Sequence, residues 1–174
     1  MEFELQQAIE ILERTPAVVS QLLNNLSPGW TLNNEGTDTW SAFDVIGHLI
    51  HGDETDWLTR AGIILSDSGN KAFIPFDRFA QFEASKNKSL AQLLSKFKKV
   101  RKRSIKKLKQ LNITASQLTK TGVHPAFGEV TLSELLAAWV VHDLDHIYQI
   151  SRILAKQYKK ETGPWIEYLK ILRQ

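Results

Sequence analysis

Four long stretches of this chain carry apolar residues spaced by three and four positions, and this spacing constrains the fold more than any other feature. The stretches cover residues 3–26, 41–65, 89–112 and 132–160. Apolar side chains at every third or fourth position share one face of an α-helix, so each stretch predicts an amphipathic helix. Four such helices can bury these faces together. We therefore predict an all-α fold, a four-helix bundle in one domain over residues 1–174.

Two of these helices have recognisable start signals. Ser41 is followed by Asp44, and Thr131 is followed by Glu134. A hydroxyl residue with an acidic residue three positions later forms a capping box, in which each side chain binds the backbone N–H of the other residue. The second and fourth helices are therefore predicted to begin directly after Ser41 and Thr131.

The remaining segments complete the predicted topology. Residues 71–87 form a long crossover, which lets the third helix start from the far end of the bundle and run parallel to the second. Pro16 is expected to kink or split the first helix. No strand pattern is present, so the glycine-containing stretch before the fourth helix is predicted to be a loop. Gly163 and Pro164 interrupt the fourth helix and precede a short C-terminal helix near residues 165–170.

Composition excludes several kinds of site and location. The chain has no cysteine, which excludes disulfides, thiolate metal sites and cysteine nucleophiles. Any metal ion must therefore be held by nitrogen and oxygen atoms. No apolar run approaches the length that spans a bilayer. The first five residues are acidic and apolar, without the basic region of a signal peptide. We therefore expect a cytoplasmic protein without a membrane partner.

The positive charge of the chain is concentrated on the third predicted helix. The net charge is only +3, but basic residues follow one side of this helix from Lys96 to Lys109. Such a face could contact a phosphate backbone or an anionic ligand. No stacking aromatic residues are interleaved with these cations, which favours a solvated helix face over a nucleic-acid partner. The residues of this face are Lys96, Lys98, Lys99, Arg101, Lys102, Arg103, Lys106, Lys107 and Lys109.

Histidines supply the candidate metal ligands. His142 and His146 lie four residues apart in the fourth predicted helix, so both imidazoles project from one face, one turn apart. His48 on the second predicted helix is the candidate third ligand. Three protein ligands leave coordination positions open for water or substrate, as in catalytic metal sites. We expect His51 to support or rim this pocket, and His124 to be an ordinary loop residue.

Three further residues lie one helical turn from these histidines. Asp44 precedes His48 by one turn, and Gln149 follows His146 at a similar distance. Either side chain could hydrogen-bond a ligand imidazole or a bound water, although Asp44 is equally well explained as a helix cap. Trp139 lies one turn before the histidine pair, where it forms either a pocket wall or part of the core.

Together these residues resemble the DinB-like family of metal-binding four-helix bundles, which includes the YfiT-type proteins. In that family a histidine on the second helix joins an H-x-x-x-H pair on the fourth, the places taken here by His48, His142 and His146. The resemblance implies an up-down-down-up bundle, a zinc or nickel ion and a homodimer. It also implies relatives such as bacillithiol transferases and mycothiol-dependent maleylpyruvate isomerases. Similar features extend along the chain at Trp40-Ser41, Gly47-His48-Leu49 and Gly163-Pro164-Trp165.

The predicted site suggests two classes of function. Three neutral imidazoles leave a divalent ion its full charge, which acidifies a bound water or thiol. The first hypothesis is a metal-dependent enzyme that activates a thiol or water for transfer to, or hydrolysis of, a small-molecule substrate. A low-molecular-weight thiol would then be a co-substrate, and no catalytic residue is assigned beyond the metal site. The alternative is a non-catalytic metal-binding or dimerisation bundle with a structural or vestigial site.

Overall fold

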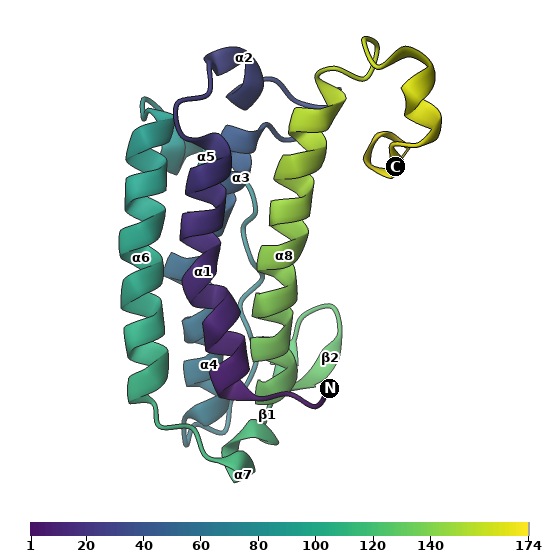
Figure 1. Ribbon diagram of the computed structural model, residues 1–174. Coiled ribbons are helices and arrows are strands. Elements are labelled where there is room, and N and C mark those ends of the chain that lie inside the picture. Colours follow the sequence, from purple (N-terminus) through teal and green to yellow (C-terminus); the bar gives the residue numbers. More distant parts are fainter. Residues whose placement is uncertain (174) are drawn as a thin grey trace.

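A computed structural model describes residues 1–173, in which four long helical segments form a bundle (Figure 1). In Figure 1, α1 and α8 run upward, whereas α3 with α4 and then α6 run downward, so the topology is up-down-down-up. Both α1 and α3 pack against α6 and α8. The long segments are α1 (Leu5–Leu23), α3 (Ala42–Thr55) continued by α4 (Trp57–Leu65), α6 (Leu90–Gln110) and α8 (Leu132–Lys156).

The first helix, α1, is not split at Pro16, although this residue lies inside it. Proline has no N–H to donate to the carbonyl oxygen four residues earlier, which here belongs to Leu12. Leu12 is fully buried, and its oxygen accepts a hydrogen bond from Arg101 of α6 instead. The helix therefore continues through the proline without an unsatisfied buried acceptor.

The second predicted helix begins as expected but is interrupted near its middle. The Ser41 hydroxyl accepts from the N–H of Asp44, and the Asp44 carboxylate accepts from the N–H of Ser41, at 3.2 and 2.9 Å. The sequence predicted one helix through residue 65, but it is divided into α3 and α4 at Asp56, where the backbone is distorted to φ −110° and ψ −74°. There the Asp56 carboxylate pairs with Arg60 at 2.7 Å in the first turn of α4.

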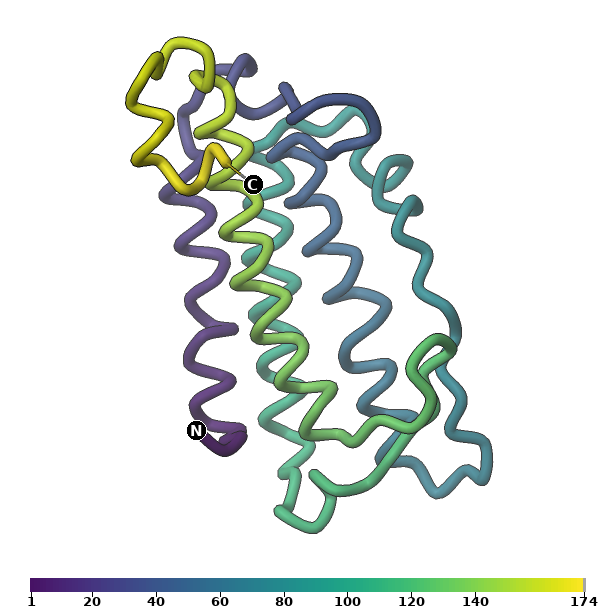
Figure 2. Tube along the Cα trace, turned by 90° about the vertical axis from the view of Figure 1, so that its right-hand side faces the viewer, coloured from purple at the N-terminus to yellow at the C-terminus, as the bar shows by residue number. Residues whose placement is uncertain are grey.

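The crossover carries the chain back to the top of the bundle, so that α6 runs parallel to α3 (Figure 2). It contains one short helix, α5 (Ala80–Ser85). Near its start, the N–H of Phe73 donates a hydrogen bond of 2.9 Å to the carbonyl oxygen of Val123, which belongs to a two-stranded hairpin. The hairpin consists of β1 (Thr121–His124) and β2 (Gly128–Thr131), where the sequence predicted only a loop. Strands of four residues are too short to show a clear alternation.

Two glycines let the crossover and the hairpin pack closely. A Cβ atom on Gly47 of α3 would lie 2.6 Å from Oγ of Ser85, and one on Gly122 would lie 2.5 Å from a ring carbon of Phe73. Both distances are shorter than van der Waals contact allows. Gly47 thus admits α5 against α3 directly beside His48.

The fourth helix, α8, begins at its predicted capping box and ends four residues before its predicted limit. The Thr131 hydroxyl accepts from the N–H of Glu134 at 3.2 Å. Beyond α8, the predicted short helix is formed by two 3₁₀ segments, of which the second buries Leu172 beside α8. No helix within residues 1–173 is long and apolar enough to cross a membrane. The short elements not yet bounded are α2 (Pro28–Thr31), α7 (Ala115–Leu118), η1 (Gly163–Glu167) and η2 (Lys170–Leu172).

Candidate metal centre

His48 on α3 meets His142 and His146 on α8 between these two helices. The Nε2 atom of His142 lies 3.0 Å from Nε2 of His48 and 3.1 Å from Nε2 of His146. The side chain of His142 is a quarter exposed, whereas His48 and His146 are buried. His51 and His124 lie outside this cluster. The three predicted ligands therefore converge, with one side of the cluster open.

The two short contacts at His142 cannot both be well-aligned hydrogen bonds between neutral rings. A neutral imidazole nitrogen carries either one hydrogen or one lone pair, which makes one good hydrogen bond and can be shared between two neighbours only as a weaker one. A cation that receives a lone pair from each ring nitrogen removes this conflict. Two ring nitrogens that bind one metal ion at about 2.0–2.1 Å, with an N–metal–N angle of about 90–110°, lie roughly 2.9–3.4 Å from each other. The observed separations fall in this range, so the cluster is consistent with a divalent metal ion.

The orientation of His146 is fixed by Gln149. The amide oxygen Oε1 of Gln149 lies 2.7 Å from Nδ1 of His146. Because an amide oxygen only accepts, Nδ1 must carry the hydrogen, and Nε2 then presents its lone pair to the cluster. Metal-binding histidines are commonly held in this way by a second hydrogen bond.

Burial keeps two of the rings in the form that binds metal. Burial, reinforced by the neighbouring His146 and His142, lowers the pKa of His48 to about 3. Burial likewise lowers the pKa of His146 to about 4, with His142 adding to the effect. Both rings are therefore neutral near pH 7, as a nitrogen ligand must be.

Aromatic rings enclose the cluster. Trp40 lies 4.8 Å from His48, and Phe76 approaches the same ring at 5.6 Å, measured between ring centroids. Trp57 meets His142 edge-on at 5.1 Å. Sequence reasoning missed the positions of Trp57 and Phe76 at the site. The available signal for Phe76 is a series of phenylalanines spaced by three in the crossover, at residues 73, 76, 79 and 82.

The other three residues predicted to support the pocket do not hydrogen-bond the ligand imidazoles. The Asp44 carboxylate is engaged in the capping box of α3. His51 lies against the ring of Phe76 at 5.0 Å, outside the three-histidine cluster. Trp139 is fully buried and stacks on Trp57 at 5.8 Å, so it occupies the core, one of the two positions that the sequence left open. Of the four predicted supporting residues, Gln149 alone hydrogen-bonds a ligand imidazole within the described residues 1–173.

A buried ion network lies behind the cluster. Arg101 was assigned to the basic helix face, but this is wrong, because the residue is 1% exposed and lies in the core. Its guanidinium binds Asp53 at 2.7 and 2.9 Å and also binds Asp143. Asp143 directly follows His142 and has a carboxylate oxygen 3.9 Å from Nδ1 of that ring. The network thereby holds α8 in place beside the histidine pair.

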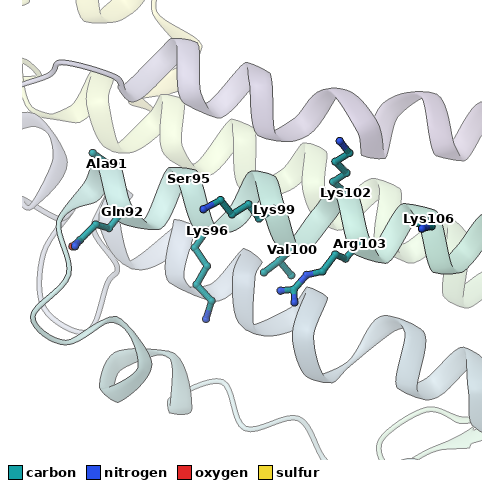
Figure 3. Close-up of a pocket in the computed structure, with 9 residues that line it drawn as sticks. All are labelled: Ala91, Gln92, Ser95, Lys96, Lys99, Val100, Lys102, Arg103 and Lys106. Carbon is teal, nitrogen blue, oxygen red and sulfur yellow. The ribbon is translucent and has the colours of Figure 1, made fainter.

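Five of the remaining basic residues of α6 line a shallow groove of about 890 Å³ (Figure 3), namely Lys96, Lys99, Lys102, Arg103 and Lys106. Lys96 pairs with Glu54 at 2.9 Å. Figure 3 shows Lys102 pointing to the opposite side of the helix from Lys96 and Arg103. Because the charged ends diverge, they do not form one anion-binding site, which agrees with a solvated helix face.

A separate cleft of about 820 Å³ opens above the histidine cluster. Its walls come from the segment before α3, from α3, from the crossover and from α8. The histidines are therefore reachable by a small molecule. Residues that line this cleft besides the histidines include Glu35, Trp40, Arg78, Phe82, Gln149 and Arg152.

Comparison with known proteins agrees with the four-helix fold. Residues 11–150 match the DinB superfamily. Among solved structures, the chain is similar to YfiT from Bacillus subtilis, which is described as a probable metal-dependent hydrolase with an unusual four-helix bundle topology. The two share 20% sequence identity with a TM-score of 0.73, over 87% of this chain and 86% of that chain. This likeness shows the fold. No curated protein gave a significant match.

Proposed function

The chain belongs to the DinB superfamily, and we propose that it is a metal-dependent enzyme whose three clustered histidines bind one divalent ion. The observation that carries the proposal is the pair of Nε2 contacts at His142, 3.0 and 3.1 Å, since a neutral ring nitrogen can make only one of them as a well-aligned hydrogen bond. His48 and His146 complete the ligand set. Zinc and nickel suit such a set of imidazole nitrogens.

The proposed reaction is transfer to, or hydrolysis of, a small-molecule substrate. A divalent ion held by three neutral imidazoles supplies a Lewis acid that lowers the pKa of a bound water or thiol. The chain has no cysteine, so a thiol nucleophile would come from a low-molecular-weight co-substrate. The description of YfiT as a probable metal-dependent hydrolase supports the use of water. Gln149 would keep the lone pair of His146 directed at the ion, and Trp40 would exclude solvent beside His48.

Metal analysis of untagged protein tests the binding step. We expect about one zinc or nickel ion per chain, as three protein ligands at one centre require. Replacing His48, His142 or His146 with alanine should remove the ion, whereas His124→Ala is a matched control that should keep it. Free ion at about 100 times its Kd should stabilise the wild-type fold by about 2.7 kcal/mol. Absence of bound metal after incubation with zinc and with nickel would overturn the proposal.

A turnover assay tests the catalytic step separately. Metal-loaded protein is incubated with esters, amides and alkylating electrophiles, with and without thiols such as cysteine. Turnover that disappears in the His142→Ala variant supports an enzyme. Stoichiometric metal without turnover across this panel contradicts the enzymatic part and favours a structural site. The homodimer and the cytoplasmic location expected from the sequence remain predictions.

A further inference from the structure

The cleft contains one cation that has no partner within residues 1–173. Arg78 lies on the crossover at the cleft wall, is exposed, and makes no ion pair or side-chain hydrogen bond there. The other arginine of the cleft, Arg152, is bound by Glu35 through two hydrogen bonds of 2.8 Å. Asp38 also lines the cleft but does not pair with Arg78. The charge of Arg78 is therefore free to act on a ligand.

Arg78 lines the same cleft as the three histidines. A guanidinium beside a centre that binds a cation is electrostatically unfavourable by itself, because the two positive charges repel each other. An anionic group placed between them attracts both, and these two attractions offset the repulsion. The position of Arg78 thus favours a negatively charged ligand.

The same cleft has an exposed aromatic wall. Phe82 lies 6.4 Å from Trp40 and 6.4 Å from Phe79, so the three rings follow one another along the cleft. Trp40 in turn contacts His48. Phe79 and Phe82 are 66% and 40% exposed. Neighbouring aromatic side chains left open beside polar groups are typical of a ligand-binding surface.

We propose that the cleft binds a small molecule that carries both a carboxylate and a flat apolar group. The carboxylate accepts hydrogen bonds from Arg78, and the apolar group lies on Phe82 and Phe79. This inference rests on the proposed function, because it places the rest of the substrate at the three histidines. It assigns the substrate class of the enzyme: an anionic, partly aromatic molecule, in preference to a neutral or cationic one.

Calorimetry with two matched probes tests this assignment. The probes are 3-phenylpropanoate and its neutral amide, titrated into zinc-loaded protein and into metal-free protein. Arg78→Gln should weaken binding of the carboxylate about tenfold, since a hydrogen bond to a charged group is lost, and should leave the amide unchanged. Arg78→Lys should retain part of the preference. Phe82→Ala should weaken both probes severalfold. Arg103→Gln, on the exposed face of α6, is the matched control and should bind both probes like the wild type.

The outcomes separate this inference from the proposed function. If the protein binds no metal, a preference for the carboxylate that depends on Arg78 still supports the inference while the metal-dependent function fails. If removal of zinc abolishes carboxylate binding and Arg78→Gln does not change it, the carboxylate binds the ion directly, and the assignment to Arg78 is overturned. Equal affinity for the two probes would also overturn it.

Discussion

Arg101 donates a hydrogen bond from Nη1 to the carbonyl oxygen of Leu12 at 2.9 Å. In an uninterrupted helix this oxygen would accept from the N–H of residue 16, and Pro16 has none. The same guanidinium binds Asp53 of α3 and Asp143 of α8. One buried side chain of α6 therefore connects all four helices of the bundle, and it does so directly behind the candidate metal centre.

Replacing Arg101 with methionine should lower the free energy of unfolding by about 3–5 kcal/mol, because two buried carboxylates lose their partner. Urea unfolding followed by circular dichroism measures this change. Lys102→Met, on the exposed side of the same helix, is the matched control and should stay within about 0.5 kcal/mol of the wild type. A loss below about 1 kcal/mol for Arg101→Met would contradict an essential role for the network.

A methyl group at Gly47 should destabilise the fold, because its carbon would lie 2.6 Å from Oγ of Ser85 and 3.2 Å from Oε1 of Gln81. We expect Gly47→Ala to cost about 1–3 kcal/mol through overpacking between α3 and α5, measured by urea unfolding. Gly62→Ala is the matched control, because nothing lies within 4 Å of its added carbon. Because residue 62 lies inside a helix, Gly62→Ala should instead raise the free energy of unfolding by up to about 1 kcal/mol.

The double variant Gly47→Ala with Ser85→Ala identifies the cause. Removing the Ser85 hydroxyl eliminates the closest contact, so the double variant should recover most of the stability lost in Gly47→Ala. Residues this close should couple rather than add. Additive losses would indicate that α5 does not pack on α3 as described.

The bundle could be predicted because its signals are local and periodic. The apolar spacing and the capping boxes at Ser41 and Thr131 need no information from distant residues. The break at Asp56 has no such signal, since neither proline nor glycine marks it. The hairpin depends on contact with the crossover around Phe73, which sequence spacing does not record. Tertiary contacts therefore determine the break at Asp56 and the hairpin, which the local sequence pattern did not predict.

The candidate site was predictable to a similar extent. Spacing and the family resemblance identified the three histidines, but Arg101 was assigned to the wrong face because it is charged. Its position did carry a signal: it follows Phe97 by four residues and precedes Leu108 by seven, which places it on the buried stripe of α6. Its partners Asp53 and Asp143 come from other helices, and a single sequence does not indicate such pairings.

The contribution of Glu35 to stability should depend on pH. Both carboxylate oxygens of Glu35 bind Arg152 at 2.8 Å, and Lys156 adds a contact at 3.1 Å. The hydrogen bond from Arg152, more than any other cause, lowers the pKa of Glu35 below its ordinary 4.5. A carboxyl with a lower pKa in the folded state stabilises the fold above its ordinary pKa. This stabilisation is lost as the pH falls through the lowered value.

Comparison with Glu35→Gln isolates this effect. The free energy of unfolding of the wild type should exceed that of the variant by about 1–2 kcal/mol at pH 7, as expected for a partly exposed, charge-assisted pair. The difference should shrink steadily below pH 4.5, the ordinary value of the group. Urea unfolding at several pH values measures it. Glu83→Gln, in an exposed pair with Lys86, is the control and should show little difference at any pH. If the difference in free energy of unfolding between the wild type and Glu35→Gln stays constant down to pH 3, the ion pair is not its source.

Removing the hydrogen bond to His146 should weaken metal binding without removing a ligand. Gln149 lies 2.7 Å from Nδ1 of His146 and fixes which ring nitrogen carries the hydrogen. Gln149→Leu should therefore lower zinc affinity about 10–100-fold, whereas Gln149→Glu, which keeps an acceptor oxygen, should retain most of it. Competition with a chromophoric chelator measures the affinity. Gln157→Leu, near the end of the same helix, should bind zinc like the wild type. Unchanged affinity in Gln149→Leu would mean that another group sets the orientation of this imidazole.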